Sequence, residues 1–352
     1  MKKVLMKTLS ALTAGILLSA GLTSCGSSEG SSNATVTKNG KTLTTVDFQL
    51  KWLPSVQFMG FYVAYEKGYY EDEGIDLNII SGGSDIVSAQ QVSIGAADIG
   101  IANLYGLLPY EEQGYPIVEI GQVFQEGSLM LCSKASSGIK TPEDLKGKKI
   151  GAWVGTADYP IYSLLDKVGL DKDKDCTIVS QDYTMDALLN DEIDVASANI
   201  YNEYIVLQES GLSKDDINVI NFEDYDCGML EDAIIANTDW AAQDGSDKLM
   251  EGFMRASMKG WSDACTDPEA AAEIVWNYVD QSSTTLEHQK ASAKEVASLA
   301  APDGTEAEKM LRLGDDKIGS TVDACLKFDI IKEKPAKVYD DSYWKAAVEG
   351  LK

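Results

Sequence analysis

Short apolar runs alternate with segments of helical periodicity along the first third of the chain. The runs have the length of buried strands, and glycine or Gly-Ser turns separate them from the helical segments. Strands that alternate with helices are typical of a parallel sheet covered by helices. We therefore expect an α/β fold, with strands at 46–50, 75–80 and 99–102 and helices at 60–66 and from about 85.

A second series of the same kind begins near Ser133. The strand expected at 129–133 precedes a short helix with capping signals, because Thr141 comes before Pro142 and Asp144 completes a capping box. Further strands are expected at 149–154, 177–180, 194–198 and 218–221, and helices at 160–168, 185–190 and 202–209. This series predicts a second lobe over residues 133–229.

The chain returns to the first lobe through a strand at 233–237 and then becomes helical. Apolar residues recur there at spacings of three and four, as in Phe253, Ala256 and Trp261, which indicates helices packed on the first lobe. The first lobe would thus consist of residues 42–132 and 230–352. The expected helices are 248–266, 268–278, 286–299, 309–314 and 342–351.

The first 41 residues have a different character. Three lysines precede an apolar run over 9–22, which is typical of a secretory signal, here residues 1–24. Leu22-Thr23-Ser24-Cys25 is similar to a bacterial lipobox, so we expect lipidation at Cys25; a signal peptide that ends in a chance cysteine is the alternative. Residues 25–41 are rich in Ser, Gly and Asn and predict a flexible tether. The protein is then held on the extracytoplasmic face of the cell membrane, in an envelope of one membrane or two.

Charge and cysteine content restrict the function further. The formal net charge of −26 opposes contact with nucleic acid and with anionic lipid. Beyond Cys25 the five cysteines are odd in number and have no CxxC spacing, which argues against a disulfide scaffold and a zinc site, although one pair remains open. These five are Cys132, Cys176, Cys227, Cys265 and Cys325. We expect a monomer that handles a small solute.

Catalytic motifs are scarce. The single histidine, His288, lies between Glu287 and Gln289 in a helix that we expect to be exposed. Catalysis by a Ser-His-Asp or Cys-His group would depend on that one residue, and a histidine-based metal site would need more than one. The chain also lacks a phosphate-binding glycine loop and an HExxH motif. We therefore expect no enzyme activity, no cofactor and no bound metal.

Aromatic residues give a stronger signal in the stretch from Trp52 to Tyr70. Trp52 follows the first strand, and Pro54 turns the chain out of the sheet. In doubly wound sheets, ligands bind beyond the carboxyl ends of the strands, where Trp52 and Gln57 would project. A flat heterocycle can stack on such an indole while polar groups hold its edge. Tyr65, Tyr69 and Tyr70 are expected to pack in the core instead.

Several ordered motifs resemble one family. The segments are WLPSVQFMGFYVAYEKGYYEDEGIDL from Trp52, TPEDLKGKKIGAW, YPIYSLLDKVGLD, NIYNEY and GMLEDAIIA. Together they resemble, over roughly residues 45–240, the solute-binding proteins of ABC importers that serve thiamine pyrimidine precursors and riboflavin. The resemblance implies a type II periplasmic-binding fold: two doubly wound α/β lobes, joined by two crossing strands near 129–133 and 229–233, that close over a ligand in the cleft between them.

The resemblance also suggests ligand-binding residues. Trp52 matches the stacking tryptophan, and Gln57 and Phe58 occupy the loop that faces the cleft. Members for thiamine pyrimidines often carry histidine where this chain has Phe58, so pyrimidine synthesis is in doubt. The Gln-Phe pair and Tyr201-Asn202-Glu203 are closer to the riboflavin members.

Other candidates come from expected strand ends, from the helices expected at 60–66 and 202–209, and from the return crossing. Trp153 and Tyr62 could belong to the core, and Asn202 could cap a helix while it binds a ring edge. Glu231 is the weakest candidate at the return crossing. The remaining ligand-binding candidates are Asn103, Gln125, Tyr201, Glu203 and Asp232.

The sequence therefore predicts capture without chemistry. The partners would be a planar heterocycle, either a riboflavin-like flavin or a thiamine pyrimidine precursor, and the permease subunits of an importer. The alternatives are an exported enzyme of thiamine-pyrimidine metabolism, a ligand-sensing module, and a sulfonate such as taurine as the ligand.

Overall fold

The computed structural model describes residues 34–38, 40–154 and 157–352. The expected signal peptide and the lipidation site at Cys25 lie outside the described residues. Residues 34–352 form one compact unit. Among the described residues, no helix combines the length and the apolar character needed to cross a membrane.

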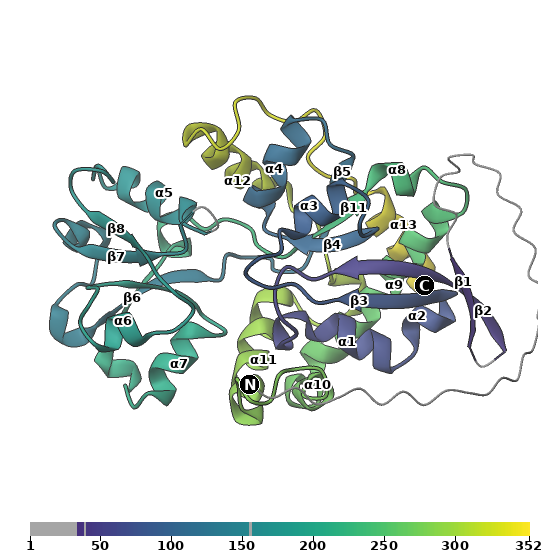
Figure 1. The fold of residues 1–352 in the computed structure, drawn as a ribbon, viewed down its shortest axis with the longest axis horizontal. Coiled ribbons are helices and arrows are strands. Elements are labelled where there is room, and N and C mark those ends of the chain that lie inside the picture. Colours follow the sequence, from purple (N-terminus) through teal and green to yellow (C-terminus); the bar gives the residue numbers. More distant parts are fainter. Residues whose placement is uncertain (1–33, 39, 155–156) are drawn as a thin grey trace, which may run out of the picture. The chain divides into compact units, whose positions relative to one another are not determined.

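The first lobe is built on a six-stranded sheet (Figure 1). The strand order is β1-β2-β4-β11-β5, and β3 pairs with β2. The sheet is mixed and not purely parallel as expected, because β11 returns from the second lobe and runs antiparallel to both β4 and β5. The strands are β1 Thr35–Lys38, β2 Lys41–Gln49, β3 Ile75–Ile80, β4 Ile99–Ala102, β5 Ile117–Gln122 and β11 Ala233–Asn237.

Strand β1 corrects the expectation of a tether up to residue 41. Thr35 to Lys38 pair antiparallel with the start of β2, and Lys38 forms an ion pair with Asp76 on β3. The Thr-Val-Thr-Lys sequence alternates as an edge strand does, and β-branched residues favour that conformation. The ordered chain therefore begins before Thr42.

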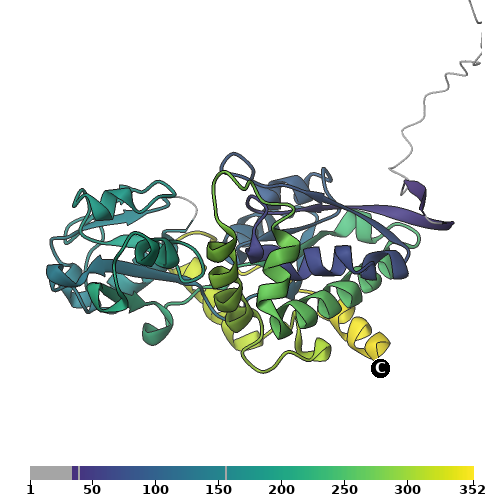
Figure 2. The ribbon, with the colours of Figure 1, turned by 90° about the horizontal axis from the view of Figure 1, so that it is seen from below.

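Helices cover both faces of this sheet (Figures 1 and 2). On one face α1 and α9 approach closely: an added Cβ on Gly60 would lie 2.2 Å from the Trp261 ring, and one on Gly260 would lie 2.2 Å from the Gly60 carbonyl. The other face packs against α3, α4 and α12. The helices are α1 Met59–Glu66, α2 Tyr69–Asp72, α3 Ser88–Ser93, α4 Leu104–Glu112, α8 Thr238–Ala241, α9 Ser246–Thr266, α10 Pro268–Val275, α11 Leu286–Ala300, α12 Asp315–Lys327 and α13 Ser342–Leu351.

The second lobe has a three-stranded antiparallel sheet of order β10-β6-β9 and a parallel pair, β7 and β8. The expected capping box of Thr141 and Asp144 is present, although it opens a 3-10 turn, Pro142–Leu145, and not an α-helix. The elements are β6 Leu129–Lys134, β7 Lys149–Ala152, α5 Tyr159–Lys167, β8 Thr177–Ser180, α6 Asp186–Leu189, β9 Ala196–Asn199, α7 Glu203–Glu209 and β10 Ile217–Asn221.

Two segments connect the sheets, residues 123–128 and residues 222–232. They are tied together, since the Gly127 amide donates to Glu223 at 2.7 Å and the Val123 amide donates to the Asp232 carbonyl at 3.1 Å. Strand β6 pairs with β9 and β10, so Leu129 to Cys132 lie in the sheet of the second lobe. The crossing on this side therefore precedes the segment 129–133 that the sequence suggested.

Four further elements differ from the expectations. The helix expected at 309–314 is a three-residue 3-10 turn, Ala307–Lys309, after which Leu311 adopts a left-handed φ of 58°. Helices α4 and α12 and strand β5 were not expected. In α4, Pro109 interrupts the helical signal, because proline removes a backbone donor in a helix interior.

Candidate functional site

A cavity of about 500 Å³ is lined by residues of both lobes. The first lobe contributes Lys51, Trp52, Gln57, Ser88, Asn103, Tyr105, Gln289 and Ser292, among others. The second lobe contributes Trp153, Tyr159, Tyr183, Asn199, Tyr201, Asn202 and Glu203, and the second crossing segment contributes Glu231.

Three aromatic rings meet at this cavity. The centroids of Trp52 and Tyr183 are 4.6 Å apart with an interplanar angle of 50°, and Tyr183 is stacked at 19° against Trp153 at 6.1 Å. The Trp153 indole donates to the Asp182 carbonyl at 3.0 Å. Trp52 comes from the first lobe and the other two rings from the second, so the lobes meet through an aromatic contact.

The backbone of Trp52 is fixed by Gly82. The Gly82 amide donates to the Trp52 carbonyl at 3.0 Å, and an added Cβ on Gly82 would lie 2.5 Å from the Trp52 nitrogen. The loop after β3 must therefore be glycine at this point to approach the end of β2.

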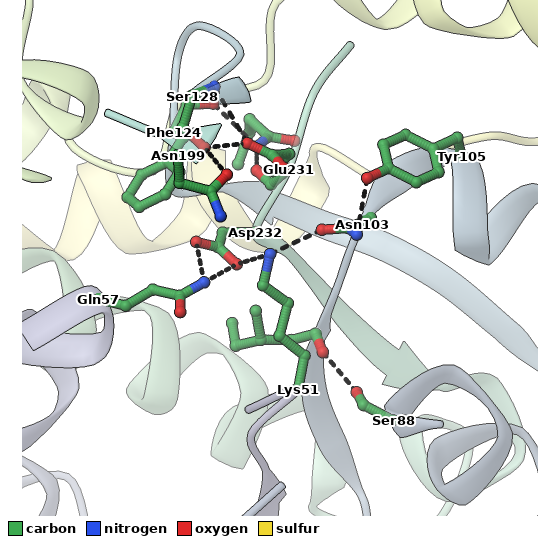
Figure 3. Close-up of polar contacts among 12 residues, drawn as sticks. Lys51, Gln57, Ser88, Asn103, Tyr105, Phe124, Ser128, Asn199, Glu231 and Asp232 are labelled. Carbon is green, nitrogen blue, oxygen red and sulfur yellow. Dashed lines mark hydrogen bonds and ion pairs between the residues drawn. The ribbon is translucent and has the colours of Figure 1, made fainter. Parts of the chain in front are cut away.

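Lys51 and Asp232 form the centre of a polar network (Figure 3). Lys51 Nζ is 2.7 Å from Asp232 Oδ1 and donates to Asn103 Oδ1 at 2.6 Å. Gln57 Nε2 donates to both oxygens of Asp232, at 3.1 and 3.0 Å, and Asn103 Nδ2 donates to the Tyr105 hydroxyl at 2.8 Å. Asp232 is 1% exposed, so its charge depends on these partners.

Asp232 also holds an unusual backbone conformation. Its φ of 57° lies in the left-handed region, which side chains other than glycine adopt at a cost. Asp232 directly precedes β11, and its carboxylate points toward Lys51 (Figure 3).

Two further carboxylates line the cavity, Glu231 and Glu203. Ser128 donates to Glu231 through its amide, at 3.0 Å, and through its hydroxyl. Glu203 accepts from the Asn199 amide at 2.9 Å and from Asn202 Nδ2 at 2.7 Å. Burial raises the pKa of both side chains, and Lys51 partly offsets the effect on the pKa of Glu231. Lys51 is the only lysine or arginine among the described residues of the lining.

Helix α11 forms another part of the wall. Gln289 Oε1 accepts from the Val56 amide at 3.0 Å, while the buried hydroxyl of Ser292 has no hydrogen-bond partner among the described residues. A buried hydroxyl without a partner at a cavity is suited to bond with a ligand.

His288, on the same helix, is 6% exposed, which corrects the expectation of a surface position. Its ring nitrogens lie 3.0 Å from Glu209 Oε2 and 3.0 Å from Asn202 Oδ1, both in the second lobe. The polar neighbours in the sequence concealed this contact because it is made with another lobe.

Seven of the predicted ligand-binding residues line the cavity: Trp52, Gln57, Asn103, Trp153, Tyr201, Asn202 and Glu203. Asp232 lies behind the lining and holds Lys51 and Gln57. Phe58 and Tyr62 do not reach it, since they are 1% and 2% exposed and pack in the core of the first lobe. The turn Val56–Phe58 directs Gln57 to Asp232 and Phe58 into that core.

Gln125 also lies outside the lining. Its amide nitrogen is bonded to the carbonyls of Gln122 at 2.7 Å and Arg312 at 3.0 Å, so it braces the first crossing segment.

Sequence reasoning missed Lys51, Tyr183, Asn199 and Ser292. Asn199 ends β9, Lys51 stands two residues after β2, and Tyr183 follows β8, so the strand-end rule that identified Trp52 applied to all three. Ser292 has no such signal, because it lies in the middle of a helix.

The lining offers hydrogen-bonding groups and aromatic surfaces for stacking. None of its described residues is a cysteine, all five described cysteines are free thiols, and burial raises the pKa of the Cys132 thiol to about 12. No cluster suited to a metal ion occurs in residues 34–38, 40–154 and 157–352.

Relatives of known name match most of the chain. Riboflavin-binding protein RibY of Chloroflexus aurantiacus is 25% identical over 287 residues, which cover 78% of this chain and 80% of the relative. The formylaminopyrimidine-binding protein of Halalkalibacterium halodurans is 23% identical over 247 residues, which cover 69% of this chain and 73% of the relative.

The architecture matches solved structures as well. The putative sulfonate ABC transporter periplasmic sulfonate-binding protein SsuA of Methylobacillus flagellatus superposes with a TM-score of 0.63 at 15% identity, over 91% of this chain and 93% of that chain. This likeness confirms the expected type II periplasmic-binding fold. The model of the family described as NMT1/THI5 like matches residues 55–271, which is more than half of the chain. The chain therefore belongs to the NMT1/THI5-like family.

Proposed function

We propose that this protein is the solute-binding component of an ABC import system and captures an uncharged planar heterocycle between its lobes. The observation that carries the proposal is the cavity whose lining combines the aromatic rings Trp52, Tyr183 and Trp153, from both lobes, with the polar side chains Lys51, Gln57 and Asn103. The names of the two relatives, which bind riboflavin and a formylaminopyrimidine, support the same class of ligand.

The size of the cavity fits this class. Sites for small molecules commonly enclose about 300 to 1,000 Å³ and combine apolar walls with a few placed polar groups. The cavity of about 500 Å³ has room for a tricyclic flavin as well as for a single pyrimidine ring. The three aromatic rings of its lining offer more stacking surface than one pyrimidine requires, so we place a riboflavin-like flavin first and a thiamine pyrimidine precursor second.

The charge of the wall argues against an anionic ligand. Lys51 is held by Asp232 at 2.7 Å, and Glu203 and Glu231 add two buried carboxyl groups to the lining. A sulfonate or a phosphate ester would find no cation free of a partner among the described lining residues and would face these carboxyl groups. The sulfonate alternative is therefore disfavoured, and so is a phosphorylated flavin.

Capture follows from contacts that need both lobes. Residues 123–128 and 222–232 are the segments about which the lobes would turn, because they alone connect the sheets among the described residues. A ligand that touches Trp52 and Trp153 together gains its second set of contacts only when the lobes meet, so binding favours that state. A permease would then recognise the ligand-bound form.

Isothermal titration calorimetry tests this function on residues 34–352, which contain the compact unit. The panel comprises riboflavin, its 5′-phosphate, hydroxymethylpyrimidine, formylaminopyrimidine and taurine. We expect micromolar or tighter binding of riboflavin or a pyrimidine, with the 5′-phosphate and taurine at least tenfold weaker. Absence of binding throughout the panel would contradict the proposal, and turnover of a bound compound would favour the enzyme alternative.

The same proposal includes a lipid anchor at Cys25. Labelling of cells with a fatty-acid analogue should mark the wild-type protein at the membrane, and Cys25→Ser should abolish the label and release the protein. Retention of the label in Cys25→Ser would refute the anchor.

A further inference from the structure

The cavity has two ends of different chemical character. At the first end α4 meets α5 of the second lobe, where the rings of Tyr105 and Tyr159 lie edge to face with their centroids 6.0 Å apart. At the second end α11 meets α7, through the contacts of His288 with Asn202 and Glu209. Helices α4 and α11 pack on opposite faces of the first-lobe sheet (Figure 1). The cavity therefore extends past the edge of that sheet from one face to the other.

The α4–α5 end is apolar. Its lining residues Pro109, Tyr110, Tyr159 and Ile330 carry no charge. Tyr110, Tyr159 and Ile330 also pack against the apolar cluster that α4 shares with α3 and α12. Burial of apolar ligand surface against this wall is favourable and leaves no polar group of the ligand without a partner. A methyl-bearing edge of an aromatic ring system suits such a wall.

Gly106 leaves space at this end. Gly106, Pro109 and Tyr110 are spaced by three and four residues, so they share one face of α4, and all three line the cavity, whereas Leu107 and Leu108 are buried. An added Cβ on Gly106 would have no atom within 4 Å. Neither a left-handed φ nor close packing requires glycine here, although glycine is a poor helix former. The glycine instead keeps the cavity-facing side of α4 open.

The α11–α7 end offers hydrogen bonds. Gln289 and Ser292 line it from α11, and Asn202 and Glu203 line it from the start of α7. Ser292 is 2% exposed, and its hydroxyl has no hydrogen-bond partner among the described residues. A hydroxyl group both donates and accepts, so a hydroxyl of the ligand can bond with Ser292 and another can donate to the carboxyl group of Glu203.

We infer that the ligand is two-ended: an uncharged aromatic ring system places a methyl-bearing edge beside Gly106, and a polyhydroxyl substituent lies at the α11–α7 end. This inference rests on the proposed function and deepens it, because it selects a ligand that bears both groups, as riboflavin does, over a single pyrimidine ring. Gly106 and Ser292 are then specificity-determining residues, one at each end.

The first test fills the space beside Gly106. Fluorescence titration on residues 34–352 compares riboflavin with its analogue that lacks the two methyl groups of the ring system. Gly106→Leu should raise the dissociation constant of riboflavin about tenfold or more, and that of the analogue at least about threefold less, because its smaller edge leaves room for the new side chain. Equal losses for the two flavins, or no loss, would overturn the inference.

A matched variant separates this effect from a change in the fold. Gly319→Leu also adds a side chain to a helical glycine whose Cβ would have no atom within 4 Å, but Gly319 is outside the cavity lining. It should leave the affinity for both flavins unchanged. Gly106→Leu should not lower the midpoint of thermal unfolding, because leucine is a better helix former than glycine.

The second test concerns the α11–α7 end. Lumiflavin keeps the methyl-bearing ring system but has a methyl group in place of the polyhydroxyl chain. Ser292→Ala should weaken riboflavin binding about fivefold, the effect of one hydrogen bond, and leave lumiflavin binding unchanged. Gly106→Leu should weaken both flavins alike. If Gly106→Leu spares lumiflavin, the chain and not the ring edge lies beside Gly106, and the inference is wrong.

This inference and the proposed function fail on different results. Absence of binding by every compound of the calorimetric panel contradicts the proposed function. Binding of a pyrimidine without binding of riboflavin leaves the proposed function standing and overturns the two-ended ligand.

Discussion

The indole of Trp52 and the phenol ring of Tyr183 lie with their centroids 4.6 Å apart, although one belongs to the first lobe and the other to the second. Tyr183 is half exposed, and its other neighbour is Trp153. The pair brings an aromatic face of each lobe to the same point of the cavity wall. A planar ligand can therefore replace ring-to-ring contact by ring-to-ligand contact on both sides.

Replacement of either ring should weaken ligand binding. We expect Trp52→Ala and Tyr183→Ala each to raise the dissociation constant at least tenfold, about 1.4 kcal/mol, because each removes one stacking face. Calorimetry measures the effect, and Tyr115→Ala, which removes another exposed aromatic ring outside the cavity lining, should leave the affinity unchanged. Unaltered binding by Trp52→Ala would remove the indole from the site.

Loss of Lys51 should destabilise the fold through Asp232. In Lys51→Met the Asp232 carboxylate, which is 1% exposed, keeps the hydrogen bond from the Gln57 amide but loses its cation. We expect this change to lower the free energy of unfolding by about 3 kcal/mol. Adding Asp232→Asn should recover most of this cost, since the buried charge is then absent. Urea unfolding provides the measurement. Lys337→Met breaks an exposed ion pair with Asp340 and should cost less than about 1 kcal/mol.

A buried pair of glutamates should make the stability fall at alkaline pH. Burial, with the nearby Glu119, raises the pKa of Glu111 from 4.5 to about 9, and burial raises the pKa of Glu119 well above its ordinary value. The folded state then binds more protons than the unfolded state between about pH 4.5 and 9, so stability falls as pH rises through this range.

Urea unfolding at pH 6 and pH 9 tests this dependence. Glu119→Gln should reduce the loss of stability between the two pH values, and Glu111→Gln should do the same if the first variant folds poorly. Glu308→Gln, an exposed position, should leave it unchanged. An equal loss in all the variants would show that other groups are responsible.

The contact of α1 with α9 leaves no space for a methyl group. In Gly260→Ala the new Cβ would meet the Gly60 carbonyl at 2.2 Å, and backbone cannot move aside as a side chain can. We expect a loss of about 3 kcal/mol or more in the free energy of unfolding. Gly319→Ala, in helix α12 with nothing within 4 Å of the added Cβ, should be neutral or gain up to about 1 kcal/mol. Thermal unfolding of both variants compares them directly.

The sequence predicted elements with local signals well and long-range contacts less well. Strands β3, β4, β8 and β11 have the expected bounds because each is a short apolar run between turn residues. The antiparallel direction of β11 has no local signal, since it depends on the path through the second lobe.

For the site, too, positions with a local signal were predicted better than those that depend on long-range contacts. The strand-end rule located Trp52, Asn103 and Trp153 in the lining. Phe58 was misplaced because a 3-10 turn of three residues directs it into the core, and Tyr62 because it lies in α1 and packs in the same core. The burial of His288 could not be read from α11, since it is produced by α7 of the other lobe.

Strand β11 lies between β4 and β5 in the sheet of the first lobe, yet it follows the whole second lobe in the chain. During synthesis from the amino terminus, β4 and β5 are therefore made well before β11, the strand that lies between them. The sheet can be completed only after residue 237 has been synthesised, and every described strand of the second lobe has been synthesised by then. Folding of the two lobes is thus coupled in time, and a chain halted before that residue leaves two strands with unpaired inner edges.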